Sequence, residues 1–217
     1  MIFPSDTILI AGDSWGCGEW SSDNNPYHIT HRGLEHYLTE FGCNVINLSK
    51  PGGSNKDMVR ALAATLPIYY PEHVFWFQTD PIRDLRPYQQ ETFPKSSSEL
   101  METNRELLEN TYSELNNIGV KIYCMGGVVN LEKSIEKYSN LIPIIPSIVE
   151  MFEGPTIDYW ISDWINYPNI RLSDDFLSEL ENHPQYILPK KWFYPDGVHP
   201  NRQAHRKIFE CILKQHK

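Results

Sequence analysis

The sequence predicts an α/β/α sandwich, in which a mostly parallel sheet is covered by helices on both faces. Two observations support this fold class. Short apolar segments without polar alternation recur along the chain, as expected of strands buried on both faces. Most are followed by a segment with apolar residues three or four positions apart, the spacing of a helix. A chain of 217 residues suits one domain with a sizeable core, so we expect residues 1–217 to form a single domain.

The expected elements follow from these patterns. Strands are expected over residues 7–11, 45–48, 73–78 and 120–125. Helices are expected over residues 31–41, 58–66, 99–118, 173–180 and 201–213. Gly42 and Pro67 are natural ends for the first two helices. Residues 17–30 and 85–98 are polar or rich in proline and serine, so we expect loops there.

Residues from about 130 to 192 are expected to form an insertion. The segment is broken at Pro143, Pro146, Pro155 and Pro168. It is also dense in aromatic residues, among them Phe152, Tyr159, Trp160, Trp164 and Tyr167. One interpretation is a subdomain in which these side chains form a core. The other is a wall that binds a sugar or aryl ligand.

Composition excludes several classes of function. A formal charge of −9 and a pI near 5.3 disfavour binding to nucleic acid or to an anionic membrane, because phosphates are bound by clustered Lys and Arg. Four cysteines lie far apart, in no metal-binding spacing, so we expect buried free thiols, no metal and no cofactor. No leader-like segment and no long apolar run is seen, which favours a cytoplasmic protein.

The first expected strand leads directly into Gly12-Asp13-Ser14. A buried strand that ends in a tight turn delivers a hydroxyl to the edge of the sheet, so Ser14 is a candidate nucleophile. The alternative is an ordinary strand-to-helix turn, since Gly, Asp and Ser are preferred in turns and caps.

A second cluster precedes the last expected helix, where Asp196 and His199 lie three residues apart in a turn made by Gly and Pro. Such a turn can direct His199 to the sheet edge while Asp196 holds its other ring nitrogen. The alternative is a histidine that only packs or caps the turn. Because the carboxyl ends of parallel strands meet at one edge, Ser14 and His199 are expected to lie together.

Taken together, these motifs resemble three of the four sequence blocks of the SGNH (GDSL-type) hydrolases. Gly12-Asp13-Ser14, Asn47 with Gly52 five residues later, and Asp196 with His199 occur in the family's order, across about residues 14–205. The resemblance implies a flavodoxin-like fold with a five-stranded sheet and hydrolysis of an ester.

The resemblance also implies roles for individual residues. Ser14 would be the nucleophile, His199 its base and Asp196 the group that orients the imidazole. Backbone N–H groups of Ser14 and Gly52 would bind the oxyanion. Gly52 is preferred to Gly53 on its spacing from Asn47. His205 fits a trailing phrase of the family and is expected to be structural.

The third block departs from the family pattern. Where the family has Gly-x-Asn-Asp, this chain has Phe77-Gln78-Thr79-Asp80. The Thr79 hydroxyl and the Gln78 amide are the candidate replacement donors, whereas an ionised Asp80 only accepts. Losing one oxyanion donor costs roughly 2.7–4 kcal/mol of transition-state stabilisation. Arg83, just beyond, either reaches an acidic group of the substrate or forms a surface pair with Asp84.

Other residues near the motifs have weaker signals. Trp15 and Trp20 are expected to line the mouth of the pocket, and Cys17 is a thiol close to Ser14 or a small packing residue. His28, His31 and His36 lack the accompanying carboxylates of a metal site.

The sequence therefore predicts a serine esterase that acts on a small-molecule or glycan ester. Two alternatives from other classes remain. One is a carbohydrate-binding protein on the same fold that has lost catalysis at the third block, and the other is a structural or assembly component.

Overall fold

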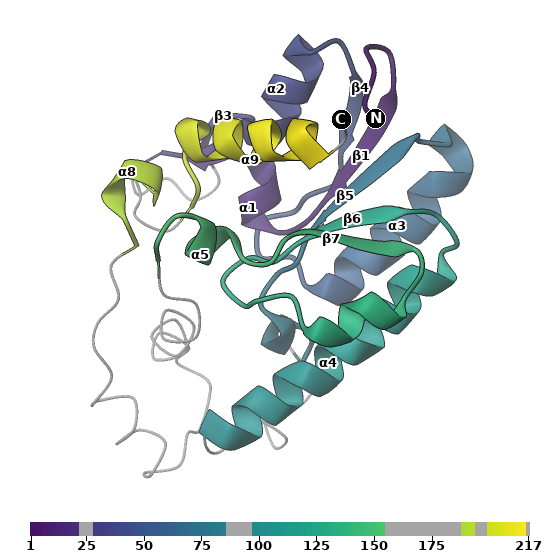
Figure 1. Ribbon diagram of the computed structural model, residues 1–217, viewed down its shortest axis with the longest axis vertical. Coiled ribbons are helices and arrows are strands. Elements are labelled where there is room, and N and C mark those ends of the chain that lie inside the picture. The colour runs from purple at the N-terminus through teal and green to yellow at the C-terminus, as the bar shows by residue number, and fades with distance from the viewer. Residues whose placement is uncertain (22–27, 86–96, 155–187, 194–198, 216–217) are drawn as a thin grey trace.

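A five-stranded parallel sheet forms the centre of the protein (Figure 1). The computed structural model describes residues 1–21, 28–85, 97–154, 188–193 and 199–215. The strand order is β4 (Asn44–Asn47), β1 (Thr7–Ala11), β5 (His73–Phe77), β6 (Ile122–Met125) and β7 (Leu141–Ile145). All four strand pairs are parallel, which confirms the predicted fold class.

Helices cover both faces of this sheet (Figure 1). The helices α2 (Gly33–Glu40), α5 (Ile148–Met151), α8 (Lys190–Phe193) and α9 (Arg202–Gln215) contribute to one core, and α3 (Asn55–Tyr69) and α4 (Ser97–Asn117) to the other. Successive residues of a strand point to opposite faces. Accordingly, Ile8 and Ile10 pack in the first core, whereas Leu9 and Ala11 pack in the second. Apolar residues on both faces explain why β1 lacks polar alternation.

Helix α3 and the expected loop 17–30 differ from the sequence expectation. Helix α3 continues through Pro67 to Tyr69 and is capped by Tyr70, whose φ of 46° is left-handed. Pro67 lies in the last turn, so its missing N–H removes only one hydrogen bond of the helix. The expected loop 17–30 contains an antiparallel pair, β2 (Glu19–Trp20) and β3 (Ile29–His31). Two- and three-residue strands are too short to show alternation.

The start of the expected insertion supplies part of the sheet. Strand β7 lies at the sheet edge and includes Pro143, which is tolerated there because an edge strand needs only one set of ladder hydrogen bonds. Phe152 is buried against Trp192 and Phe193, as the core interpretation expects of this residue. The other four aromatic residues and the expected helix 173–180 lie outside the described residues.

Three of the four free cysteines are buried and Cys211 is half-buried. Within the part of the chain that the structure describes, no helix is both long and apolar enough to cross a bilayer.

Candidate active site

Ser14 lies just beyond the carboxyl end of β1, where the strand order places β4 on one side and β5 on the other. It opens the short helix α1 (Ser14–Cys17), and the side chain of Asp13 caps this helix by accepting a hydrogen bond from Trp15 N at 2.9 Å. In doubly wound sheets, ligands bind at the carboxyl edge where the chain reverses its direction of winding. The turn thus presents the Ser14 hydroxyl at the edge where a ligand is expected.

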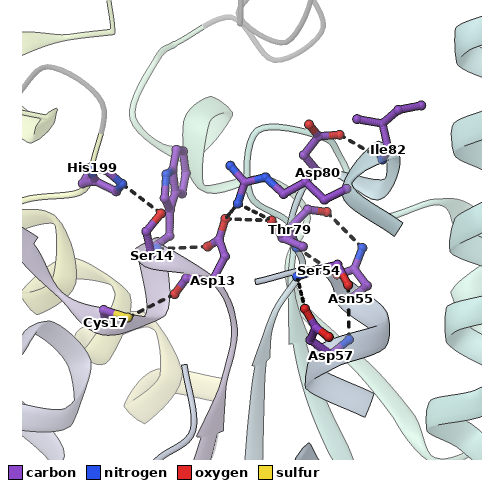
Figure 2. Close-up of polar contacts among 12 residues, drawn as sticks. Asp13, Ser14, Cys17, Ser54, Asn55, Asp57, Thr79, Asp80, Ile82 and His199 are labelled. Atoms are coloured by element: carbon purple, nitrogen blue, oxygen red, sulfur yellow. Dashed lines mark hydrogen bonds and ion pairs between the residues drawn. The ribbon is translucent and has the colours of Figure 1, made fainter. Parts of the chain in front are cut away.

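His199 reaches this hydroxyl from the distant end of the chain. Its Nε2 atom lies 2.8 Å from Ser14 Oγ (Figure 2). This distance is within the range of about 2.6–3.2 Å that a nucleophile and its general base require. With Nε2 unprotonated, the imidazole can accept a hydrogen bond from this hydroxyl. Asp196, the expected third member, lies outside the described residues.

The turn after β4 holds Gly52 close to the same edge. Lys50 N donates to Gly12 O at 3.0 Å, which ties this turn to the one that carries Ser14. Gly52 has a φ of 67°, and a Cβ there would meet no atom within 4 Å, so backbone conformation rather than crowding favours glycine. Gly53 N already donates to Lys50 O at 2.9 Å. The Gly53 N–H is therefore engaged within its own turn.

The side chains of Thr79 and Arg83 meet at Asp13 rather than at Ser14. Thr79 Oγ1 donates to Asp13 Oδ2 at 2.7 Å (Figure 2). Arg83 Nη1 donates to the same carboxylate oxygen at 2.7 Å and to Thr79 Oγ1 at 3.1 Å. Arg83 thus pairs with Asp13, while Asp84 accepts a hydrogen bond from Lys56 N at the start of α3.

Three further predicted site residues make internal contacts. Gln78 donates its two amide hydrogens to the carbonyls of Val129 and Asn130. Asp80 Oδ1 accepts from Ile82 N in the 3₁₀ turn Pro81–Leu85 (Figure 2). The buried ring of Trp15 packs against Phe193. These contacts support the fold around the site, and they leave the Gln78 amide without a spare hydrogen for an oxyanion.

Asn55 is a site residue that sequence reasoning missed. Its fully buried side chain accepts from Thr79 N at 3.0 Å and donates to Thr79 O at 3.2 Å (Figure 2). Locally it is only the first residue of α3, after the Ser54 cap that pairs with Asp57. Because its partner is 24 residues away, no short-range pattern indicates the contact.

Two other titratable groups near the turn are held in unreactive forms. Burial, together with the carboxylates of Asp13 and Glu35, raises the pKa of the Cys17 thiol to about 12. The thiol donates to Asp13 O, consistent with a packing role (Figure 2). Complete burial, followed by the charge of His31, lowers the pKa of His205 to about 3, so this ring is neutral at pH 7. No metal-binding cluster of His, Cys, Asp or Glu occurs among the described residues.

Comparisons with known proteins give matches among solved structures alone. No family model and no curated protein matches the chain. A lipase/acylhydrolase from Enterococcus faecalis is 15% identical, with 97% of this chain and 94% of that chain covered and a TM-score of 0.45. The esterase EstA from Pseudoalteromonas sp. is 17% identical, with 97% and 96% covered and a TM-score of 0.41. The acetylxylan esterase Axe2 from Geobacillus stearothermophilus is 18% identical, with 99% and 95% covered and a TM-score of 0.38.

Proposed function

We propose that the protein is a serine hydrolase of ester bonds, of the SGNH type, with Ser14 as nucleophile and His199 as general base. The observation that supports this most directly is the 2.8 Å contact between Ser14 Oγ and His199 Nε2 at the carboxyl edge of the sheet. A hydroxyl beside an imidazole is the minimal arrangement for nucleophilic acyl transfer.

The reaction proceeds in two balanced halves. Ser14 Oγ attacks the ester carbonyl carbon while its proton passes to His199 Nε2, and collapse of the tetrahedral intermediate breaks the bond to the alcohol oxygen, which takes that proton. Water then attacks the acyl carbon and gives a proton to His199. The second intermediate expels Ser14 Oγ, which recovers the proton, and the acid leaves. We assign the orientation of the imidazole to Asp196, on the resemblance of Asp196 and His199 to the family motif.

We assign the oxyanion to the backbone N–H groups of Ser14 and Gly52. The third donor of the family has no direct equivalent, because the Thr79 hydroxyl donates to Asp13 and the Gln78 amide donates to two carbonyls. Arg83 lies beside the turn, and its positive charge is partly neutralised by Asp13. A missing donor reduces the rate about 10²–10³-fold. We therefore expect slow turnover, and Arg83 is our candidate for contact with an acidic substrate group.

The substrate that we propose is a small-molecule or glycan ester. The acidic composition, with a formal charge of −9, supports a substrate other than nucleic acid or an anionic membrane surface. The chemistry requires no metal and no cofactor, because the nucleophile and the base are both side chains.

The test is covalent labelling of Ser14 by a fluorophosphonate, together with hydrolysis of an aryl acetate. We expect the native protein to be labelled and to turn over, and Ser14→Ala to lose both activities while its melting temperature is retained. Cys17→Ala is the matched control, because the raised pKa of this neighbouring thiol predicts unchanged labelling. Unchanged hydrolysis in Ser14→Ala would falsify the mechanism.

A second candidate function is a carbohydrate-binding protein on the same fold. The inward hydrogen bonds of Thr79 and Gln78 favour it, since they leave the third block without a side-chain donor for catalysis. Absence of labelling in a folded protein that binds glycan would support this second function over the first.

A further inference from the structure

The two-residue strand β2 (Glu19–Trp20) lies next to both members of the Ser14–His199 pair. It follows α1 through Gly18, whose φ of 123° turns the chain, and a Cβ at Gly18 would collide with the carbonyl of His31. Pairing with β3 holds the strand in place. Strand β2, which lies in the expected loop 17–30, is therefore held in place beside the site.

Trp20 contacts the nucleophile and the base with one side chain. Its indole Nε1 donates to the carbonyl oxygen of Ser14 at 3.0 Å. Its ring stacks on the imidazole of His199, with 4.8 Å between centroids and 26° between planes. Only 8% of Trp20 is exposed, so the indole is itself held firmly. The backbone of Ser14 and the ring of His199 thus share one rigid neighbour.

Glu19 anchors the chain on the far side of His199. Its carboxylate accepts a hydrogen bond from Arg202 N at 2.7 Å and further bonds from Arg202 Nε at 3.0 Å and Nη2 at 2.5 Å. Burial raises the pKa of Glu19, but the hydrogen bonds and charge of Arg202 outweigh it, so the net pKa is lowered and the carboxyl is ionised at neutral pH. Arg202 lies three residues after His199, so this pair fixes the start of α9 relative to β2.

We propose that Trp20 is a positioning residue that holds the His199 ring against Ser14, while Glu19 anchors the segment that carries the ring. The inference rests on the proposed function for what the pair does chemically. An imidazole can rotate about two side-chain bonds, and a misplacement of about 1 Å can cost about 10²-fold in rate. Stacking restricts that rotation. An indole face also favours the imidazolium that forms when His199 takes the proton.

Three variants separate positioning from general packing. Trp20→Leu removes the aromatic face and the indole donor, whereas Trp20→Phe keeps a face and loses only the donor. Trp192→Leu is the matched control, because the Trp192 ring stacks on Phe152 with nearly the same geometry, 4.7 Å and 26°, and is not assigned to the site.

We expect Trp20→Leu to lower kcat/KM for an aryl acetate about 10²-fold, through kcat rather than KM. Trp20→Phe should recover most of this loss. Equal losses in Trp20→Leu and Trp192→Leu, with no recovery in Trp20→Phe, would show a merely structural role and overturn the proposal.

A second measurement does not depend on activity. In protein with isotope-labelled histidine, the ring current of Trp20 should displace the His199 ring-proton signals, and the displacement should disappear in Trp20→Leu but persist in Trp192→Leu. If the native protein neither hydrolyses nor labels, the proposed function fails while this result still supports the positioning. A signal that is unchanged in Trp20→Leu overturns the positioning whatever the activity.

Discussion

Asp13 and Ser14 are adjacent in sequence, yet their side chains have different surroundings. We call the surroundings of the Ser14 hydroxyl the reactive side of the turn, and those of the Asp13 carboxylate the Asp13 side. The Ser14 hydroxyl has a histidine at 2.8 Å as its described partner. The Asp13 carboxylate, only 5% exposed, accepts hydrogen bonds from Trp15 N, Thr79 and Arg83. A buried carboxylate needs such partners, whereas a nucleophile needs a base and room for its substrate. The difference teaches that the Thr79 hydroxyl and the Arg83 guanidinium satisfy the buried carboxylate of Asp13.

The largest effect is expected on the reactive side of the turn. His199→Gln keeps a polar side chain but removes the base, so kcat should fall about 10²–10⁴-fold for an aryl acetate. His36→Gln, at a half-exposed histidine of α2, is the control and should leave kcat unchanged. Steady-state kinetics decide between these outcomes, and equal rates in the two variants would contradict the assignment of the base.

The next effect is expected on the Asp13 side. Arg83→Met leaves the buried carboxylate without its cation, which should lower the free energy of unfolding by about 3 kcal/mol. Arg105→Met removes the exposed pair with Glu102 and should leave the unfolding midpoint unchanged. Urea denaturation followed by fluorescence provides the comparison. A midpoint for Arg83→Met that matches that of Arg105→Met would mean that the Asp13 cluster does not need its charge.

A pH effect of intermediate size is expected from His205, behind the reactive side. The folded protein holds this ring neutral with a pKa of about 3, whereas an unfolded histidine has a pKa near 6.5. The unfolded state therefore binds the proton first, and stability falls by about 1.4 kcal/mol for each pH unit below about 6. His205→Gln should flatten this part of the profile relative to the native protein, as measured by urea denaturation between pH 4 and pH 7.

The smallest effect on stability is expected from the hydroxyl of Thr79, which lies on the Asp13 side. Thr79→Val deletes the hydroxyl that donates to Asp13 and should cost about 1 kcal/mol of stability. Its control is Thr111→Val, which deletes a buried hydroxyl bonded to Leu107 O in α4.

Thr79→Asn should instead raise kcat about tenfold, because an amide at this position supplies the donor that the third block lacks. A Thr79→Asn protein slower than native would indicate that the hydrogen bond from Thr79 to Asp13 matters more than an added donor.

The sequence allowed prediction of the sheet, of four of its strands and of the meeting of Ser14 with His199, because apolar periodicity and the carboxyl ends of parallel strands follow general rules. It did not reveal β7, since Pro143 and Pro146 resemble breaks when their place at an edge is unknown. Contacts of Asn55 and Trp20 were missed because each joins side chains to groups distant in sequence or to backbone atoms. The Gln78 side chain accepts a hydrogen bond from Tyr112 and donates to two carbonyls beyond β6. No local motif indicates these contacts.

The paired hydrogen bonds between Asn55 and the backbone of Thr79 have an evolutionary consequence. On the Thr79 side they involve main-chain atoms alone, so they do not depend on which side chain position 79 bears. A change in one codon therefore replaces the threonine by asparagine while the backbone of the loop keeps its hydrogen bonds to Asn55. On the proposed function, an exchange at position 79 would change the rate while these two hydrogen bonds are kept.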